Sequence, residues 1–117
     1  MTPEELRART KNFAVRVVRL YRALPKTTES QVLGKQLLRS GTSVAANYRA
    51  ACRGRSRAEW LAKIGIVVEE TDETVFWLEM LSDCDIFPEA RLKELKNEAR
   101  ELIAIFTATR HTAKNAA

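Results

Sequence analysis

The sequence predicts an all-α protein that folds as an up-and-down antiparallel four-helix bundle. Four segments carry apolar residues at helical spacing, and short connections with capping or helix-breaking residues separate them. The chain has only four Gly and three Pro in 117 residues, which is little material for the many turns of a β protein. No alternation of apolar and polar residues indicates a strand. Helices of roughly 20 residues with short connections favour antiparallel neighbours around one core.

The first helix is expected over residues 3–24. Thr2 can cap it, Pro3 suits the first helical position, and two acids follow in the first turn. One face then carries five apolar residues at helical spacing, and Pro25 ends the helix. The second helix is expected over residues 29–53, with Thr27 or Thr28 as its cap and a glycine just past its end.

The third helix is expected over residues 57–82, because Ser56 and Glu59 have the spacing of a capping box. Pro88 begins the fourth, expected over residues 88–109. Residues 1–110 are therefore predicted to form one domain, and residues 111–117 are expected to be a frayed tail.

A strip of polar residues lies beside the core face of the second helix, where Leu and Val would be usual. Two interpretations fit it. The strip can be a polar seam that fixes the register between helices, with acids of the third helix as partners, or it can bind a ligand. Small residues within it would also let a neighbouring helix approach closely. Its members are Gln36, Arg39, Ser40, Ser43 and Asn47.

The third helix has a second apolar stripe away from its core face. Ile66, Trp77 and Met80 lie near one another on it. A tryptophan outside the core indicates a contact surface, so these three residues are predicted to form an oligomer interface.

Charge is distributed unevenly along the chain. Residues 1–63 hold fourteen Lys or Arg against four Asp or Glu, whereas residues 64–117 hold six against eleven. The basic half can be neutralised by the acidic half inside the fold, or a basic surface can remain and meet a polyanion. Repulsion among clustered arginines would be relieved by phosphates. The candidate nucleic-acid-binding residues are Arg49, Arg53, Arg55 and Arg57, with Arg16 and Arg19 in support.

Catalysis has little support in the sequence. The single histidine, His111, falls in the expected tail, and neither a Gly-rich phosphate loop nor a Glu-x-x-His metal pair occurs. We therefore expect no enzyme, no metal and no cofactor. Cys52 and Cys84 form no redox or metal spacing, and with no signal peptide or apolar run of membrane length they indicate a cytoplasmic protein with no membrane partner.

Several motifs resemble a known family. They are LGKQLLRS at residues 33–40, SVAANY at 43–48, SRAE at 56–59, ETDET at 70–74 and WLE at 77–79. Together they are similar to the bacterial four-helix-bundle proteins named after 23S ribosomal RNA intervening sequences, over about residues 10–106. That family often carries a Glu shortly after the Asn, whereas Ala50 and Ala51 stand here. This chain therefore lacks the carboxylate for any role that the Glu has in that family.

The resemblance implies a ring-like oligomer, commonly a homopentamer. It also implies kinship to the accessory variability determinant of diversity-generating retroelements, a basic pentamer that binds nucleic acid and a reverse transcriptase. The expected function is thus a non-catalytic homo-oligomer that binds structured RNA or DNA through phosphates. The alternative is a protein-interaction scaffold, or accessory subunit, that docks an acidic or polymerase-like protein partner.

Overall fold

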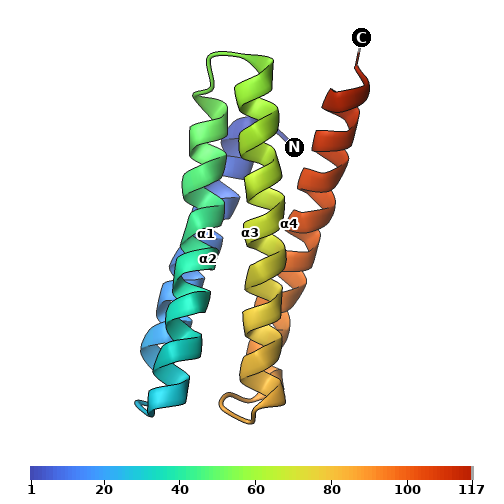
Figure 1. The fold of residues 1–117 in the computed structure, drawn as a ribbon. Coiled ribbons are helices and arrows are strands. Elements are labelled where there is room, and N and C mark those ends of the chain that lie inside the picture. Colours follow the sequence, from blue (N-terminus) through green and yellow to red (C-terminus); the bar gives the residue numbers. More distant parts are fainter. Residues whose placement is uncertain (117) are drawn as a thin grey trace.

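Four long helices make up the chain in the computed structural model, which describes residues 1–116 (Figure 1). They are α1 (Pro3–Ala23), α2 (Thr28–Cys52), α3 (Arg57–Asp83) and α4 (Glu89–Asn115). Consecutive helices run antiparallel along a long axis of 50 Å, and residues 1–116 contain no strand. The predicted all-α, up-and-down bundle is confirmed. In cross-section α1 packs on α2, α2 on α3 and α3 on α4, with a sparser contact between α4 and α1.

Side-chain caps set the starts of three helices. The Thr2 hydroxyl accepts a hydrogen bond from the Glu5 amide at 3.1 Å, and Thr27 does the same for Ser30 at 3.3 Å. Ser56 accepts from the Glu59 amide at 3.1 Å. The Glu59 carboxylate in turn accepts a hydrogen bond from the backbone amide of Arg55, the residue before the cap. These bonds satisfy amides that would otherwise lack a partner within the helix.

The core runs along the inside of all four helices. Its largest fully buried members are Phe13 and Phe106, and the Phe106 ring lies 5.1 Å from that of Tyr48. This contact joins α4 to α2, two helices that face each other diagonally. Other fully buried members are Val17, Leu37, Val44, Ile64, Val67, Leu78, Leu81, Leu92 and Leu102.

Close packing between α1 and α2 depends on Gly41. A Cβ at this position would lie 2.8 Å from both Cγ atoms of the fully buried Val17. Val17 is β-branched and therefore cannot turn both methyl groups away. A glycine within a helix costs about 1 kcal/mol relative to alanine. Here that cost is offset by the approach of the two helices.

Gly41→Ala is consequently expected to lower the free energy of unfolding, although alanine is the better helix former. Overpacking of about 1–3 kcal/mol should exceed the gain in helix propensity of about 1 kcal/mol. Gly65→Ala is the matched control, because a Cβ there would meet only the end of the long, flexible Arg110 side chain, at 3.3 Å. Urea unfolding followed by circular dichroism measures both. Equal stabilisation by the two substitutions would contradict the packing described for Gly41.

The polar strip of α2 contacts α3 through two of its members. The Arg39 guanidinium forms an ion pair with Glu70 at 3.1 Å and another with Glu73. Beneath it, the buried Thr74 hydroxyl donates to Ser40 Oγ at 3.0 Å. The remaining members bond within α2: the Asn47 amide donates to the Ser43 carbonyl at 2.9 Å, and Gln36 accepts from Arg39 at 3.5 Å.

Charged residues hold both the start and the middle of α4 in place. The Arg9 guanidinium of α1 donates two hydrogen bonds to the Glu98 carboxylate, at 2.6 and 2.7 Å. Near the start of α4, the buried Lys96 ammonium donates to Glu89 at 2.6 Å and to the α3 hydroxyl of Ser82 at 3.1 Å. The hydrogen bond from Lys96 lowers the pKa of the Glu89 carboxyl below its ordinary value.

The C-terminal end differs from the expected one. Residues 111–115, expected as part of a frayed tail, continue α4 to Asn115, while Ala117 lies outside the described residues. This segment contains no Gly or Pro that would end a helix. The Arg57 guanidinium donates to the Ala116 carbonyl at 3.1 Å and so ties this end to α3. The other helix boundaries lie within one residue of those expected.

Candidate functional site

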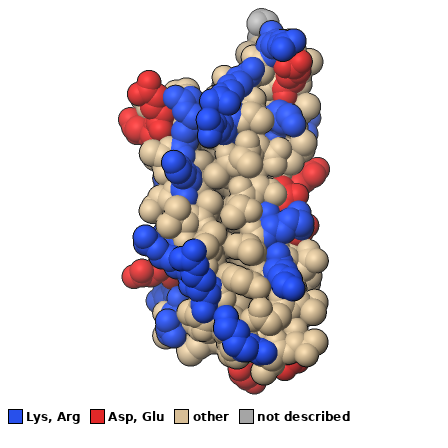
Figure 2. Space-filling view, turned by 90° about the vertical axis from the view of Figure 1, so that its left-hand side faces the viewer, with Lys and Arg blue, Asp and Glu red and all other residues tan. Residues whose placement is uncertain are grey.

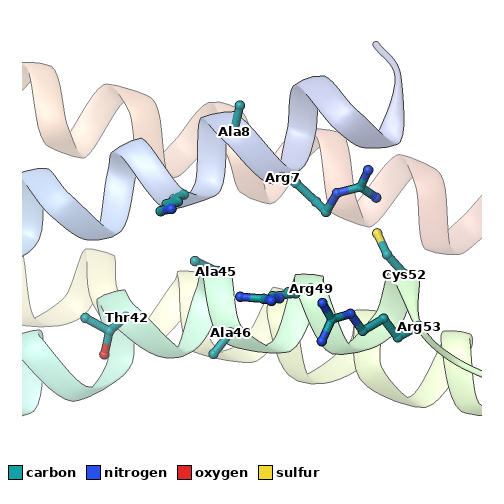
Figure 3. A pocket seen from close by; sticks show the side chains of 9 residues that line it. Arg7, Ala8, Thr42, Ala45, Ala46, Arg49, Cys52 and Arg53 are labelled. Carbon is teal, nitrogen blue, oxygen red and sulfur yellow. The ribbon is translucent and has the colours of Figure 1, made fainter.

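A groove of about 740 Å³ lies between the N-terminal part of α1 and the C-terminal part of α2 (Figure 3). We call it the cationic groove, because four of its nine lining residues are Lys or Arg. The helix α1 contributes Arg7, Ala8 and Lys11, and α2 contributes Thr42, Ala45, Ala46, Arg49, Cys52 and Arg53.

Helical spacing and chain direction bring the four cations together. Arg7 and Lys11 are four residues apart on α1, as are Arg49 and Arg53 on α2, so each pair shares one helix face. Because α1 and α2 are antiparallel, the start of α1 lies beside the end of α2. In Figure 3 the Arg7 side chain extends from α1 on the side where Cys52 lies, and the two arginines of α2 lie along the same space.

Small, uncharged residues line the groove between the cations. Ala8 and Ala46 are exposed, while Ala45 and Thr42 are half-buried. The Thr42 hydroxyl donates to the Leu38 carbonyl at 2.7 Å, which leaves its methyl group as the part available for an apolar contact. The groove therefore has a largely apolar lining between its cations, with Ala45 and Thr42 half-buried along it and Ala8 and Ala46 at its exposed edges.

The cations of the groove are not neutralised by the acids of the same chain. The ion pairs among residues 1–116 engage Arg9, Arg39 and Lys96. None of the four groove cations has a carboxylate oxygen within 4.0 Å in this part of the chain, and no acid is among the nine lining residues. Figure 2 shows this side of the bundle, where Lys and Arg gather in two columns with uncharged residues between them.

Tyr48 lies directly behind the groove and stays uncharged. Burial is the main cause that raises the pKa of its phenol well above the ordinary value, and the neighbouring Cys52 thiol adds to the rise. The nearby Arg7 charge acts in the opposite direction but is the smallest of these influences. The phenol is therefore neutral at physiological pH and contributes no negative charge beside the groove.

The six arginines predicted to bind nucleic acid divide among three places. Arg49 and Arg53 line the cationic groove. Arg55 lies beyond it in the exposed turn between α2 and α3, and the exposed Arg57 is the first residue of α3. Arg16 and Arg19 lie elsewhere, in a smaller depression of about 240 Å³ formed with α4, which also contains Glu94.

Sequence reasoning did not assign Arg7 and Lys11 to this site, although a signal for them exists. In a helical hairpin, residues at similar distances before and after the turn lie opposite each other. The turn near Lys26 therefore places the start of α1 beside residues in the second half of α2. Arg16 is five residues beyond Lys11, which rotates it by about 140° around α1 and away from the groove.

The residues predicted as an oligomer interface are half-buried on α3. The Trp77 indole N–H donates to Glu73 at 3.1 Å, and part of its ring packs against the core. Ile66 and Met80 are also half-buried. The exposed large apolar side chain of α3 is instead Phe76, which is 50% exposed and packs edge-to-face on Trp77. Sequence reasoning did not single out Phe76.

Residues 1–116 contain no group of three or more His, Cys, Asp or Glu arranged to hold a metal ion. Within the same residues, none of the helices combines the length and apolar character that crossing a membrane requires.

The fold and the groove define an all-helical up-and-down bundle with a cationic site between its first two helices. The chain belongs to the family of 23S rRNA-intervening sequence proteins, whose family model matches residues 5–108. It is also similar to a solved structure from Bacteroides thetaiotaomicron VPI-5482, described as a protein with unknown function from the S23 ribosomal protein family. The two share 33% sequence identity with a TM-score of 0.89, over 96% of this chain and 100% of that one. No curated protein matches the chain.

Proposed function

We propose that this protein is non-catalytic and binds structured RNA or DNA through phosphates in the cationic groove. In this proposal Arg49 and Arg53, opposite Arg7 and Lys11, contact the phosphate backbone. Arg55 and Arg57 extend the positive surface past the turn between α2 and α3. Guanidinium groups suit this role because their forked N–H donors match phosphate oxygens. The proposed location is the cytoplasm.

The observation that carries the proposal is the selective pairing of charges. The acids of α3 and α4 form ion pairs with Arg9, Arg39 and Lys96. The four groove cations have no such partner within residues 1–116. The acids of the same chain therefore do not neutralise the groove cations, although the charge distribution had left that alternative open. A cluster of cations binds a polyanion favourably, because the polyanion releases its counterions when it binds.

A filter-binding titration tests the proposal. Labelled RNA and DNA are titrated with the purified protein at low salt. Saturable binding with little dependence on sequence is expected, because phosphate contacts position a nucleic acid without reading its bases. Absence of binding to both at low salt would overturn the proposal. The competing scaffold function predicts instead a protein partner whose capture survives nuclease treatment.

We also propose that the protein self-associates through the exposed side of α3. Phe76 supports this, since its half-exposed ring packs on half-buried Trp77 and lies one turn from half-buried Met80, which makes an apolar patch that water disfavours. Half-buried Ile66 lies nearly three turns earlier on the same helix. The family resemblance implies a homopentameric ring. Light scattering is expected to show an oligomer that Phe76→Glu weakens, whereas a clean monomer for the unmodified chain would contradict self-association.

A further inference from the structure

The apolar lining of the cationic groove is not explained by phosphate contacts alone. Phosphates need only cations at a surface, and the four Lys and Arg side chains supply them. Ala8, Ala45, Ala46 and the Thr42 methyl group gain nothing from a phosphate oxygen. They favour a ligand that brings an apolar surface together with its negative charge.

We propose that the cationic groove holds an unpaired nucleotide of a bound nucleic acid, so that the preferred ligand has single-stranded loops or bulges rather than a continuous duplex. This inference rests on the proposed function. In a duplex the faces of the bases are stacked inside, and only phosphates and sugars would reach the groove. An unpaired nucleotide presents a phosphate and the flat, apolar face of its base at the same time.

The groove matches such a ligand in size and chemistry. Its volume of about 740 Å³ lies within the range of about 300–1,000 Å³ that is usual for small-molecule sites. A base can lie over the alanines while its phosphate meets Arg49 or Arg53. The planar guanidinium groups can also stack on the base, since Arg planes stack on unpaired bases as aromatic rings do.

Fluorescence anisotropy with two RNA probes tests this inference. One probe is a hairpin with an unpaired loop, and the other is a fully paired duplex with the same number of phosphates. The wild-type protein is expected to bind the hairpin roughly tenfold more tightly, the size of about one base contact. Equal affinity for both probes overturns the inference but leaves the proposed function standing. If the wild-type protein binds neither probe, the proposed function itself is overturned.

A variant with a narrowed groove sharpens the test. Ala8→Leu with Ala46→Leu narrows the groove from its two edges but keeps all four cations, and both positions are exposed, so the helices should still form. Ala90→Leu with Ala104→Leu, at two exposed positions of α4, is the matched control. The groove variant should lose about tenfold in hairpin affinity and keep its duplex affinity within about twofold. The control should change neither.

Three outcomes would overturn the inference. The groove variant can weaken both probes equally, or it can weaken neither. It can also alter the oligomeric state in light scattering without changing hairpin affinity, which would assign the groove to a second copy of the chain. Retained duplex binding shows that the variant is folded. If the double variant does not fold, Ala46→Leu alone provides the same comparison.

Discussion

Replacing Arg49 and Arg53 by glutamate is expected to weaken RNA and DNA binding on the order of 100-fold or more at low salt. The substitution removes the two arginines proposed to contact phosphates and places two negative charges in the groove beside Arg7 and Lys11. Both arginines are exposed, and neither has an acidic partner among residues 1–116, so the fold should lose little. Filter binding measures the affinity, and thermal unfolding checks that stability changes by less than about 0.5 kcal/mol.

Arg16→Glu with Arg19→Glu is the matched control for net charge. It changes the charge by the same amount, but these residues lie in the depression between α1 and α4. A site in the groove predicts only a few-fold loss for the control, through the general field of the molecule. Equal losses for the two variants would mean that net charge alone governs binding and that the groove is no site.

Phe106→Ala is expected to lower the free energy of unfolding by about 3–5 kcal/mol, the cost typical of removing a large buried aromatic side chain. Phe106 is fully buried and contacts the Tyr48 ring across the bundle, with 5.1 Å between ring centroids. Its loss leaves a cavity in the core, where the Phe106 ring of α4 meets the Tyr48 ring of α2. Urea unfolding followed by circular dichroism measures the change.

Val32→Ala serves as the control for this substitution. Val32 is 57% exposed, so its truncation should stay within about 0.5 kcal/mol. A loss for Phe106→Ala no larger than that of Val32→Ala would contradict the described core.

The helices were predictable because local signals mark their ends. Thr2 with Pro3, Pro25 and the Ser56–Glu59 pair act within one turn of the chain, and the structure shows side-chain hydrogen bonds at the Thr2 and Ser56 caps. The C-terminal end of α4 was not predictable in this way. It has no side-chain signal of its own, and it is held by Arg57, which is distant in sequence.

The site was only half predictable for a related reason. Arg49 and Arg53 stand out because they are close together in sequence, so their cluster is visible without a structure. Arg7 and Lys11 join them only through the register of α1 against α2, which is set by contacts such as Gly41 on Val17. Arg16 and Arg19 lie on α1 like Arg7 and Lys11, but the rotation of the helix directs them to another face.

The salt dependence of binding tests most directly whether the groove cations contact phosphates. The logarithm of the RNA-binding constant is measured against the logarithm of salt concentration for the wild-type chain and for Arg49→Gln with Arg53→Gln. Wild-type affinity should fall linearly with a slope of several units, and the variant should have a slope shallower by about two, one for each lost phosphate contact. A flat wild-type slope, or the same slope in the variant, would contradict phosphate binding in the groove.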